Sequence, residues 1–114
     1  MADPAETGAA AGTRGYWIAR ARIHDPERYK KYLAANGAAF RKYGGRFIVR
    51  NGTYEAVAGE SWPRNVVAVF DDYDTAVACF HSAEYQHAIA ERGDSADVDV
   101  LIVEGYDGPQ PGDG

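Results

Sequence analysis

The order of apolar and polar residues predicts a strand and then a long helix at the start of the chain. Residues 16–23 alternate with the two-residue period of a strand. Asp25 is a good N-cap and Pro26 suits the first helical turn, so we expect a helix that ends near Tyr43, before Gly44-Gly45. Its apolar stripe, spaced by three and four residues, is Tyr29, Tyr32, Leu33, Asn36, Phe40 and Tyr43.

The middle of the chain predicts two further strands. Residues 46–50 form the first of them, and Asn51-Gly52 is a turn signal. We interpret 53–57 as a continuation of that strand or as a hairpin arm. Residues 65–70 carry a nearly unbroken apolar run, which is typical of a central strand that is covered on both faces.

The last third predicts a broken helix and a final strand. The acidic residues of 71–74 supply caps for a second helix. His81-Ser82 marks a break, after which Ser82 caps a further helical piece that ends at Arg92. The segment 98–106 reads as the last strand.

This order predicts an α+β fold, the ferredoxin-like βαββαβ arrangement, with an antiparallel sheet and two helices on one face. The other face of the sheet then carries Tyr16, Ile18 and one side of the third strand, which are too apolar for open water. A domain of this size has nothing left to cover that face. We therefore expect a homodimer whose two sheets pack face to face.

Composition and charge exclude some classes of protein. The 114 residues are 46% hydrophobic and carry a net charge of -5, which fits one globular domain and not a strongly basic nucleic-acid binder. Residues 1–14 and 107–114 lack the apolar content that an ordered core needs, so we expect disordered tails around a domain at 15–106. These tails hold four of the 17 acidic residues and one of the 12 basic ones, so the charge indicates no particular partner.

Cysteine and histidine usage argues against several cofactors. Cys79 is the single cysteine, which rules out an intrachain disulfide and a multi-thiolate zinc site, and its apolar neighbours predict a buried side chain. The three histidines show no metal-binding spacing, so we expect neither a metal nor another cofactor. No stretch is long enough for a membrane helix and no signal peptide is recognisable, so we expect a cytoplasmic protein without a membrane partner.

Several segments together resemble a bacterial family, domain of unknown function 1330. They are Gly15-Tyr16-Trp17-Ile18, Asp25-Pro26-Glu27, Tyr43-Gly44-Gly45-Arg46-Phe47, Ser82-Ala83-Glu84-Tyr85-Gln86 and Val103-Glu104-Gly105-Tyr106. The resemblance implies a dimeric α+β barrel. Wider relatives include cofactor-free monooxygenases of polyketide tailoring, haem-degrading monooxygenases, lactone isomerases and small cyclases. A fold cannot choose among these chemistries.

Asn36 and Arg92 are polar residues on apolar helical stripes. Asn36 could hydrogen-bond a ligand, or it could be an amide that the neighbouring backbone satisfies. Arg92 could clamp a substrate carboxylate or enolate, or it could pair with an acid such as Glu60 or Glu104. In each case the structural interpretation is the commoner one in proteins.

Trp62 and Arg64 flank a proline in the loop before the third strand. Trp62 could be a lid over a pocket, or it could seal the core or a dimer interface. The strand arginines form a second basic group, in which Arg20 and Arg22 share one face and Arg46 and Arg50 share one face if the two-residue period holds. Such a patch could attract an anion, but it more often pairs with acids.

His81 lies at the expected helix break, where a pocket could open. It could act as a general base at neutral pH, although an exposed or capping histidine is commoner. Haem-degrading relatives use an axial histidine on the second helix, whereas the inward positions here are Tyr85 and Ile89, so the resemblance does not imply a haem site.

Three functions remain open. The first is a small-molecule enzyme without a tightly bound cofactor, of isomerase, cyclase or cofactor-free monooxygenase type. Its pocket lies between sheet and helices, with His81, Arg92 and Asn36 as catalytic candidates. The substrate-binding candidates are Tyr32, Phe40, Trp62, Arg64 and Tyr85. The others are a small-molecule binder and a purely structural dimer.

Overall fold

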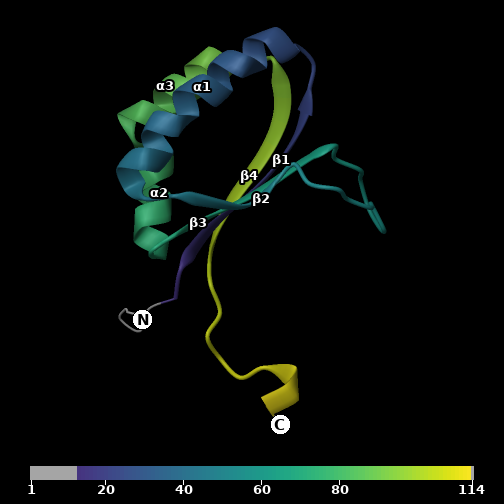
Figure 1. Ribbon diagram of the computed structural model, residues 1–114, viewed down its shortest axis with the longest axis vertical. Helices are drawn as coiled ribbons and strands as arrows, with labels where there is room; N and C mark the ends of the chain where they lie inside the picture. Colours follow the sequence, from purple (N-terminus) through teal and green to yellow (C-terminus); the bar gives the residue numbers. More distant parts are fainter. Residues whose placement is uncertain (1–12, 114) are drawn as a thin grey trace.

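A computed structural model describes residues 13–113 as one sheet covered by helices. The elements in chain order are β1 (Gly15–Ile23), α1 (Pro26–Tyr43), β2 (Arg46–Arg50), β3 (Arg64–Phe70), α2 (Tyr73–His81), α3 (Ala83–Arg92), β4 (Ala96–Glu104) and a 3₁₀ turn (Pro111–Asp113). The strands are antiparallel and their order in the sheet is β2-β3-β1-β4. The three α-helices lie on one side of the sheet (Figure 1). The predicted ferredoxin-like α+β fold is confirmed, and β3 is an internal strand as its apolar run indicated.

The helix ends are formed by the residues that the sequence predicts. The Asp25 carboxylate accepts a hydrogen bond from the Arg28 backbone N–H at 3.2 Å and caps α1. Gly44 ends that helix with a left-handed φ of 73°. Ser82 separates α2 from α3 and accepts a hydrogen bond from the Tyr85 N–H at 3.1 Å.

The core is built around the indole of Trp17, which β1 directs at the helices. Its ring meets Tyr85 edge-on with 4.8 Å between centroids, and Phe40 with 5.1 Å. The indole N–H donates to the Ala76 carbonyl at 2.8 Å, so the buried ring leaves no unsatisfied donor. Cys79 belongs to the same cluster, and burial raises the pKa of its thiol to about 12. It therefore behaves as a small apolar side chain, as predicted.

Two predicted boundaries are wrong. Residues 53–57 form no strand; the chain from 51 to 63 is a loop that leaves the sheet after Asn51, whose φ is 58° (Figure 1). A hairpin arm needs a partner strand, and this segment projects away from the sheet edge instead. The last strand begins at Ala96 and ends at Glu104, two residues earlier at each end than expected. The predicted disorder of residues 1–12 falls outside the described residues, and that of 107–114 stays a prediction.

One end of the second face of the sheet is apolar and exposed, whereas the other end carries Arg20, Asp99 and the Trp62 ring. The pairing of Ile18 with Val67 and with Leu101 puts these three side chains on the face opposite Trp17. Leu101 is 54% exposed and Ile18 is 44% exposed. Among residues 13–113 no helix covers this face. The same part of the chain contains no helix that is long and apolar enough to cross a membrane.

Candidate functional site

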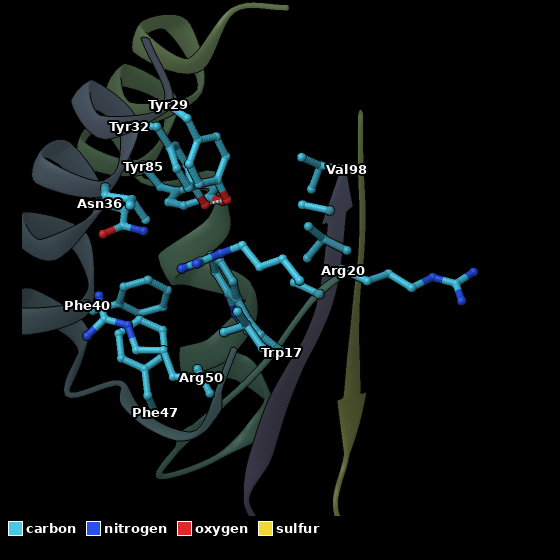
Figure 2. A pocket seen from close by; sticks show the side chains of 17 residues that line it. Trp17, Arg20, Tyr29, Tyr32, Asn36, Phe40, Phe47, Arg50, Tyr85 and Val98 are labelled. Atoms are coloured by element: carbon cyan, nitrogen blue, oxygen red, sulfur yellow. Dashed lines mark hydrogen bonds between the residues drawn. The ribbon is translucent and has the colours of Figure 1, made fainter. Parts of the chain in front are cut away.

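A cavity lies between the sheet and the helix layer, over the end of the sheet where β1 and β3 carry small side chains. Ala19 and Ala21 of β1 line it, and its free volume is about 40 Å³. Figure 2 shows this cavity from close by, with Trp17 and Phe40 among the labelled side chains. Alanines leave this space open because the helix layer is held at a distance by the bulky Trp17 further along the same strand. The cavity holds a few water molecules and has to widen for a larger ligand.

Two buried tyrosines from different helices meet at the wall of the cavity. The hydroxyl oxygens of Tyr32 on α1 and Tyr85 on α3 are 2.6 Å apart, so one hydroxyl donates to the other. The pair has two hydroxyl hydrogens and this contact uses one, which leaves one for a ligand. Burial raises the pKa of Tyr85, and the nearby Tyr32 raises it further. Tyr85 therefore stays a neutral donor at neutral pH.

Tyr29 lies one turn before Tyr32 on the same wall. Its ring centroid is 5.2 Å from that of Tyr32, and Figure 2 shows the three tyrosine rings gathered beside the cavity. Burial raises the pKa of Tyr29, while the charges of Arg64 and Arg92 act in the opposite direction. This phenol is therefore also a neutral hydrogen-bond donor at neutral pH.

Asn36 lines the cavity one turn beyond Tyr32 on α1. The residue is 6% exposed, and its amide makes no hydrogen bond to any residue in the described part of the chain. Its amide nitrogen and oxygen are not among the fully buried polar atoms that lack a partner, so they reach the surface of the cavity. The expectation of an amide satisfied by the neighbouring backbone is therefore not met, and the group is free to bind a ligand.

Two arginines reach the cavity from neighbouring strands. Arg64 begins β3 opposite Ala21, and its guanidinium carbon is 5.7 Å from the Tyr29 ring centroid. Arg50 ends β2, and its guanidinium carbon is 4.3 Å from the Phe47 ring centroid. Figure 2 shows Arg50 reaching toward α1, whereas Arg20 points away on the other side of the sheet.

A β-bulge is the reason that Arg50 faces the cavity. Arg46 pairs with Val69 and Arg50 pairs with Val66, three residues apart, so the two arginines lie on opposite faces. The expectation that Arg46 and Arg50 share a face is wrong because the register shifts between Phe47 and Val49. The two-residue period does not hold across an inserted residue.

Arg92 lies behind the tyrosine pair and not on the cavity surface. Its guanidinium carbon is 5.0 Å from the Tyr32 ring centroid, and its Nη1 is buried without a hydrogen-bond partner within the described residues. No carboxylate of residues 13–113 pairs with it, so the alternative of a salt bridge to Glu60 or Glu104 is not realised. The charge of Arg92 lowers the pKa of Tyr85 against the larger effect of burial.

Trp62 and His81 lie away from the cavity. Trp62 packs on the opposite face of the sheet, under Arg22 with 3.9 Å between the guanidinium carbon and the ring centroid. It is held there because the loop around it is tied to Arg22, which pairs with Glu60 at 2.7 Å. His81 is exposed at the end of α2, with its ring 5.3 Å from that of Phe80. Neither residue lines the pocket that the sequence interpretation assigned to them.

The described residues offer no metal site, since no three of their histidine, cysteine and acidic side chains cluster. The ionisable residues that line the cavity are tyrosines and arginines, namely Arg20, Tyr29, Tyr32, Arg50, Arg64 and Tyr85. None of these residue types is a proton acceptor at neutral pH. The arrangement can therefore bind and stabilise a developing negative charge, but it offers no general base of its own.

Comparison with known proteins places the chain in a family. Residues 14–106 match a domain of unknown function, DUF1330. The chain belongs to the DUF1330 family. The match covers all four strands and three helices described above, so the family domain and the folded domain coincide. No curated protein matches the chain in sequence.

Solved structures share the fold of this DUF1330 domain at low sequence identity. A protein of unknown function from Rhodopseudomonas palustris is 15% identical, with a TM-score of 0.68 over 95% of this chain and 96% of that one. The cofactor-independent oxygenase SnoaB from Streptomyces nogalater is 15% identical, with a TM-score of 0.58 over 87% and 98% of the two chains. A dimeric ferredoxin-like protein of unknown function from Thermobifida fusca is 19% identical, with a TM-score of 0.56 over 82% and 92%.

The structure brings together five of the eight residues that the sequence selected. They are Tyr32, Asn36, Phe40, Arg64 and Tyr85. The sequence interpretation grouped Arg50 with Arg46 in a strand patch that could attract an anion. It did not place Arg50 at the cavity, because the bulge cannot be read from the strand pattern. It also passed over Tyr29 as a ligand contact, although the position of Tyr29 on the apolar stripe of α1 was the available signal.

Proposed function

We propose that this DUF1330 protein is a small-molecule enzyme that acts in the cavity between sheet and helices without a tightly bound cofactor. The observation that carries the proposal is the unpartnered amide of Asn36, which is buried at the wall of an aromatic cavity. The amide makes no hydrogen bond within the described residues and reaches the cavity, so a substrate carbonyl or hydroxyl can hydrogen-bond to it.

The donors around the cavity suit a reaction in which an oxygen atom of the substrate gains negative charge. The spare hydrogen of the Tyr32–Tyr85 pair and the amide of Asn36 are held on two packed helices, so they need little reorganisation during a reaction. Fixed donors that face a developing oxyanion in a partly dry site are an effective source of catalysis. Enolisation and oxygenation of an electron-rich ring both develop such a charge.

The chemistry of the lining favours the cofactor-independent oxygenase type over an isomerase or a cyclase. An isomerase needs a protein base to move a proton, and the cavity lining holds none. A phenolate or enolate can itself give electrons to dioxygen, so that its carbon forms a C–OOH group. Loss of the remaining C–H proton and cleavage of the O–O bond then leave a C=O in the substrate, and the other oxygen atom leaves as water with the two hydrogens that this carbon has lost. The shared fold with SnoaB, which is a cofactor-independent oxygenase, is consistent with this choice.

Dioxygen consumption tests the proposal. Electron-rich phenols such as 1-naphthol and cyclic β-diketones would be incubated with the purified protein, with and without Asn36→Ala, in an oxygen electrode. We expect uptake that requires the protein and falls about tenfold or more in the variant, because one lost oxyanion donor costs at least that much. Uptake that is absent while the compounds bind contradicts an oxygenase. Protein-dependent uptake that is equal in both proteins contradicts the role of Asn36 as an oxyanion donor.

A non-catalytic binder is the second candidate, and the absence of a base in the described cavity lining favours it. A binder retains the donors and the aromatic walls but returns its ligand unchanged. Denaturing mass spectrometry after long incubation with a bound compound separates the two functions, since an enzyme yields a product mass and a binder yields the starting mass.

We also propose that the protein is a homodimer that joins through the open face of the sheet. Ile18, Leu101 and Val103 are each more than 40% exposed on this face, and an exposed apolar sheet face is typical of a protein interface. The ferredoxin-like relative from Thermobifida fusca is described as dimeric. The helices would then form the outer layers, and each copy would keep its own cavity. A cytoplasmic location stays a prediction from the sequence.

A further inference from the structure

The cavity carries positive charge that no acidic residue balances. Its lining contains three arginines and no aspartate or glutamate. Arg20 turns its guanidinium to the other face, where it pairs with Asp99 at 3.3 Å. Arg50 and Arg64 remain at the cavity, and neither pairs with a carboxylate anywhere in residues 13–113. In the same part of the chain Arg14, Arg22 and Arg28 each have an acidic partner, which is Asp71, Glu60 and Asp94 respectively.

Aromatic rings lie beside both guanidinium groups, and Arg64 also acts on the Tyr29 hydroxyl as a hydrogen-bond donor. Because a guanidinium has five N–H donors, both arginines keep donors for a ligand. Arg50 lies over Phe47 and Arg64 lies over Tyr29. A guanidinium that rests on a ring presents its N–H groups sideways, where they can bind a planar carboxylate through two parallel hydrogen bonds. Arg50 is exposed and Arg64 is half-buried, so together they form the entrance of the cavity.

The rest of the lining fits the apolar part of a ligand. Trp17, Phe40 and Phe47 offer flat aromatic surfaces next to the two alanines of β1. The free volume of about 40 Å³ takes a group of a few atoms as it stands. A ligand that contains a ring has to push the exposed side chain of Arg50 aside. The negative charge of the ligand then attracts the Arg50 guanidinium and holds it nearby.

We propose that the ligand of this cavity is a small organic carboxylate with a flat apolar body. Its carboxylate binds between Arg50 and Arg64 at the entrance, and its body lies against Trp17 and Phe40 in the interior. This inference uses the site of the proposed function, but it concerns binding and does not depend on turnover.

A titration with matched acids and amides tests the inference. Acetate, benzoate and 2-naphthoate would each be compared with the corresponding neutral amide, with binding followed through backbone and Trp17 indole N–H signals in two-dimensional NMR. We expect the dissociation constant of benzoate to be about tenfold lower than that of benzamide. The shifts should concentrate at Ala19, Ala21 and Trp17.

Three variants identify the charge that is responsible. Arg50→Gln and Arg64→Gln should each remove most of the preference for benzoate over benzamide. Arg46→Gln is the matched control, because Arg46 lies on the same strand as Arg50 but on the opposite face. The control should keep the full preference. Circular dichroism of each variant ensures that a loss of binding is not a loss of fold.

The outcomes separate this inference from the proposed function. No preference for any of the three acids, or an equal loss in Arg46→Gln, overturns the inference. Carboxylate binding with the expected variant pattern but without dioxygen uptake supports the inference and contradicts the oxygenase. Uptake with neutral phenols and no carboxylate preference supports the oxygenase and overturns the inference.

Discussion

At the scale of single residues, the candidate site is defined by polar side chains that have no hydrogen-bond partner among the described residues. Asn36 occupies a stripe position where leucine or alanine would be easier to bury, and its amide has no partner among the described residues. Asn65 gives the contrast, because its amide donates to the Trp62 carbonyl at 2.9 Å. Only the Asn65 amide therefore contributes a hydrogen bond to stability, although both residues are at least half-buried.

We expect Asn36→Ala to leave the free energy of unfolding unchanged or to raise it by about 0.5 kcal/mol, because alanine is the better helix former and no hydrogen bond is lost. The same change at Asn65 should lower it by about 1 kcal/mol, the net value of one hydrogen bond. Urea unfolding measures both. A loss at Asn36 as large as that at Asn65, with ligand binding intact, would make Asn36 a structural residue.

The sequence predicted the position of a residue when the pattern within one helix determined it. It did not predict contacts that depend on how two elements pack against each other. Asn36 is recognisable from the stripe of α1 alone. The contact between Tyr32 and Tyr85 joins positions 53 residues apart, so it depends on how α1 and α3 pack. Trp62 could face either side of the sheet, because the loop before β3 has no period that fixes its direction.

At the scale of elements, the cavity results from the change from a large side chain to small ones along β1. Trp17 fills the space under the helices, while Ala19 and Ala21 further along the strand leave it open. The pattern of strand faces was readable from the sequence, since the two-residue period puts all three on one side. The cavity could not be predicted from the sequence, because it depends on the distance between the helix layer and each position of the strand.

We expect Ala19→Val to abolish ligand binding without loss of stability. The added methyl groups enter the free space of the cavity, and valine favours a strand. Ala76→Val is the control, because Ala76 is fully buried in α2 beside the Trp17 indole and has no free volume next to it. Overpacking there should cost about 1–3 kcal/mol. Thermal unfolding and the benzoate titration report the two effects, and binding that survives in Ala19→Val would place the ligand elsewhere.

Elements with strong periodicity were predicted closely, and the irregular stretch between β2 and β3 was not. Asp25 and Gly44 bound α1 at the predicted residues because caps have a local chemistry. The segment 53–57 has strand-forming residues, yet it is no strand because pairing needs a neighbour and the sheet offers it none. The bulge in β2 could not be predicted either, because it arises from the pairing with β3 and not from the sequence of β2 alone.

At the scale of the whole molecule, the helices cover one face of the sheet and leave the other face exposed. The inner face builds the core and the cavity, and the outer face presents Ile18, Leu101 and Val103 to solvent in the single chain. Each of these side chains is already about half-buried, so covering the rest contributes on the order of 1 kcal/mol each, which a second copy would recover. This difference is the physical basis for the predicted dimer.

We expect Leu101→Glu to convert the dimer into a monomer, because the charge would lie at the centre of an apolar interface without a partner. Light scattering after size exclusion, at micromolar concentration, should give twice the chain mass of 12.4 kDa for the native protein and 12.4 kDa for the variant. Ala38→Glu, on the exposed side of α1, adds the same charge away from the sheet and should leave the dimer intact. If the native protein is a monomer, the outer face is not a self-interface. If Leu101→Glu monomerises the protein and the cavity still binds benzoate, each copy carries a complete site, as expected from a cavity built on the inner face alone.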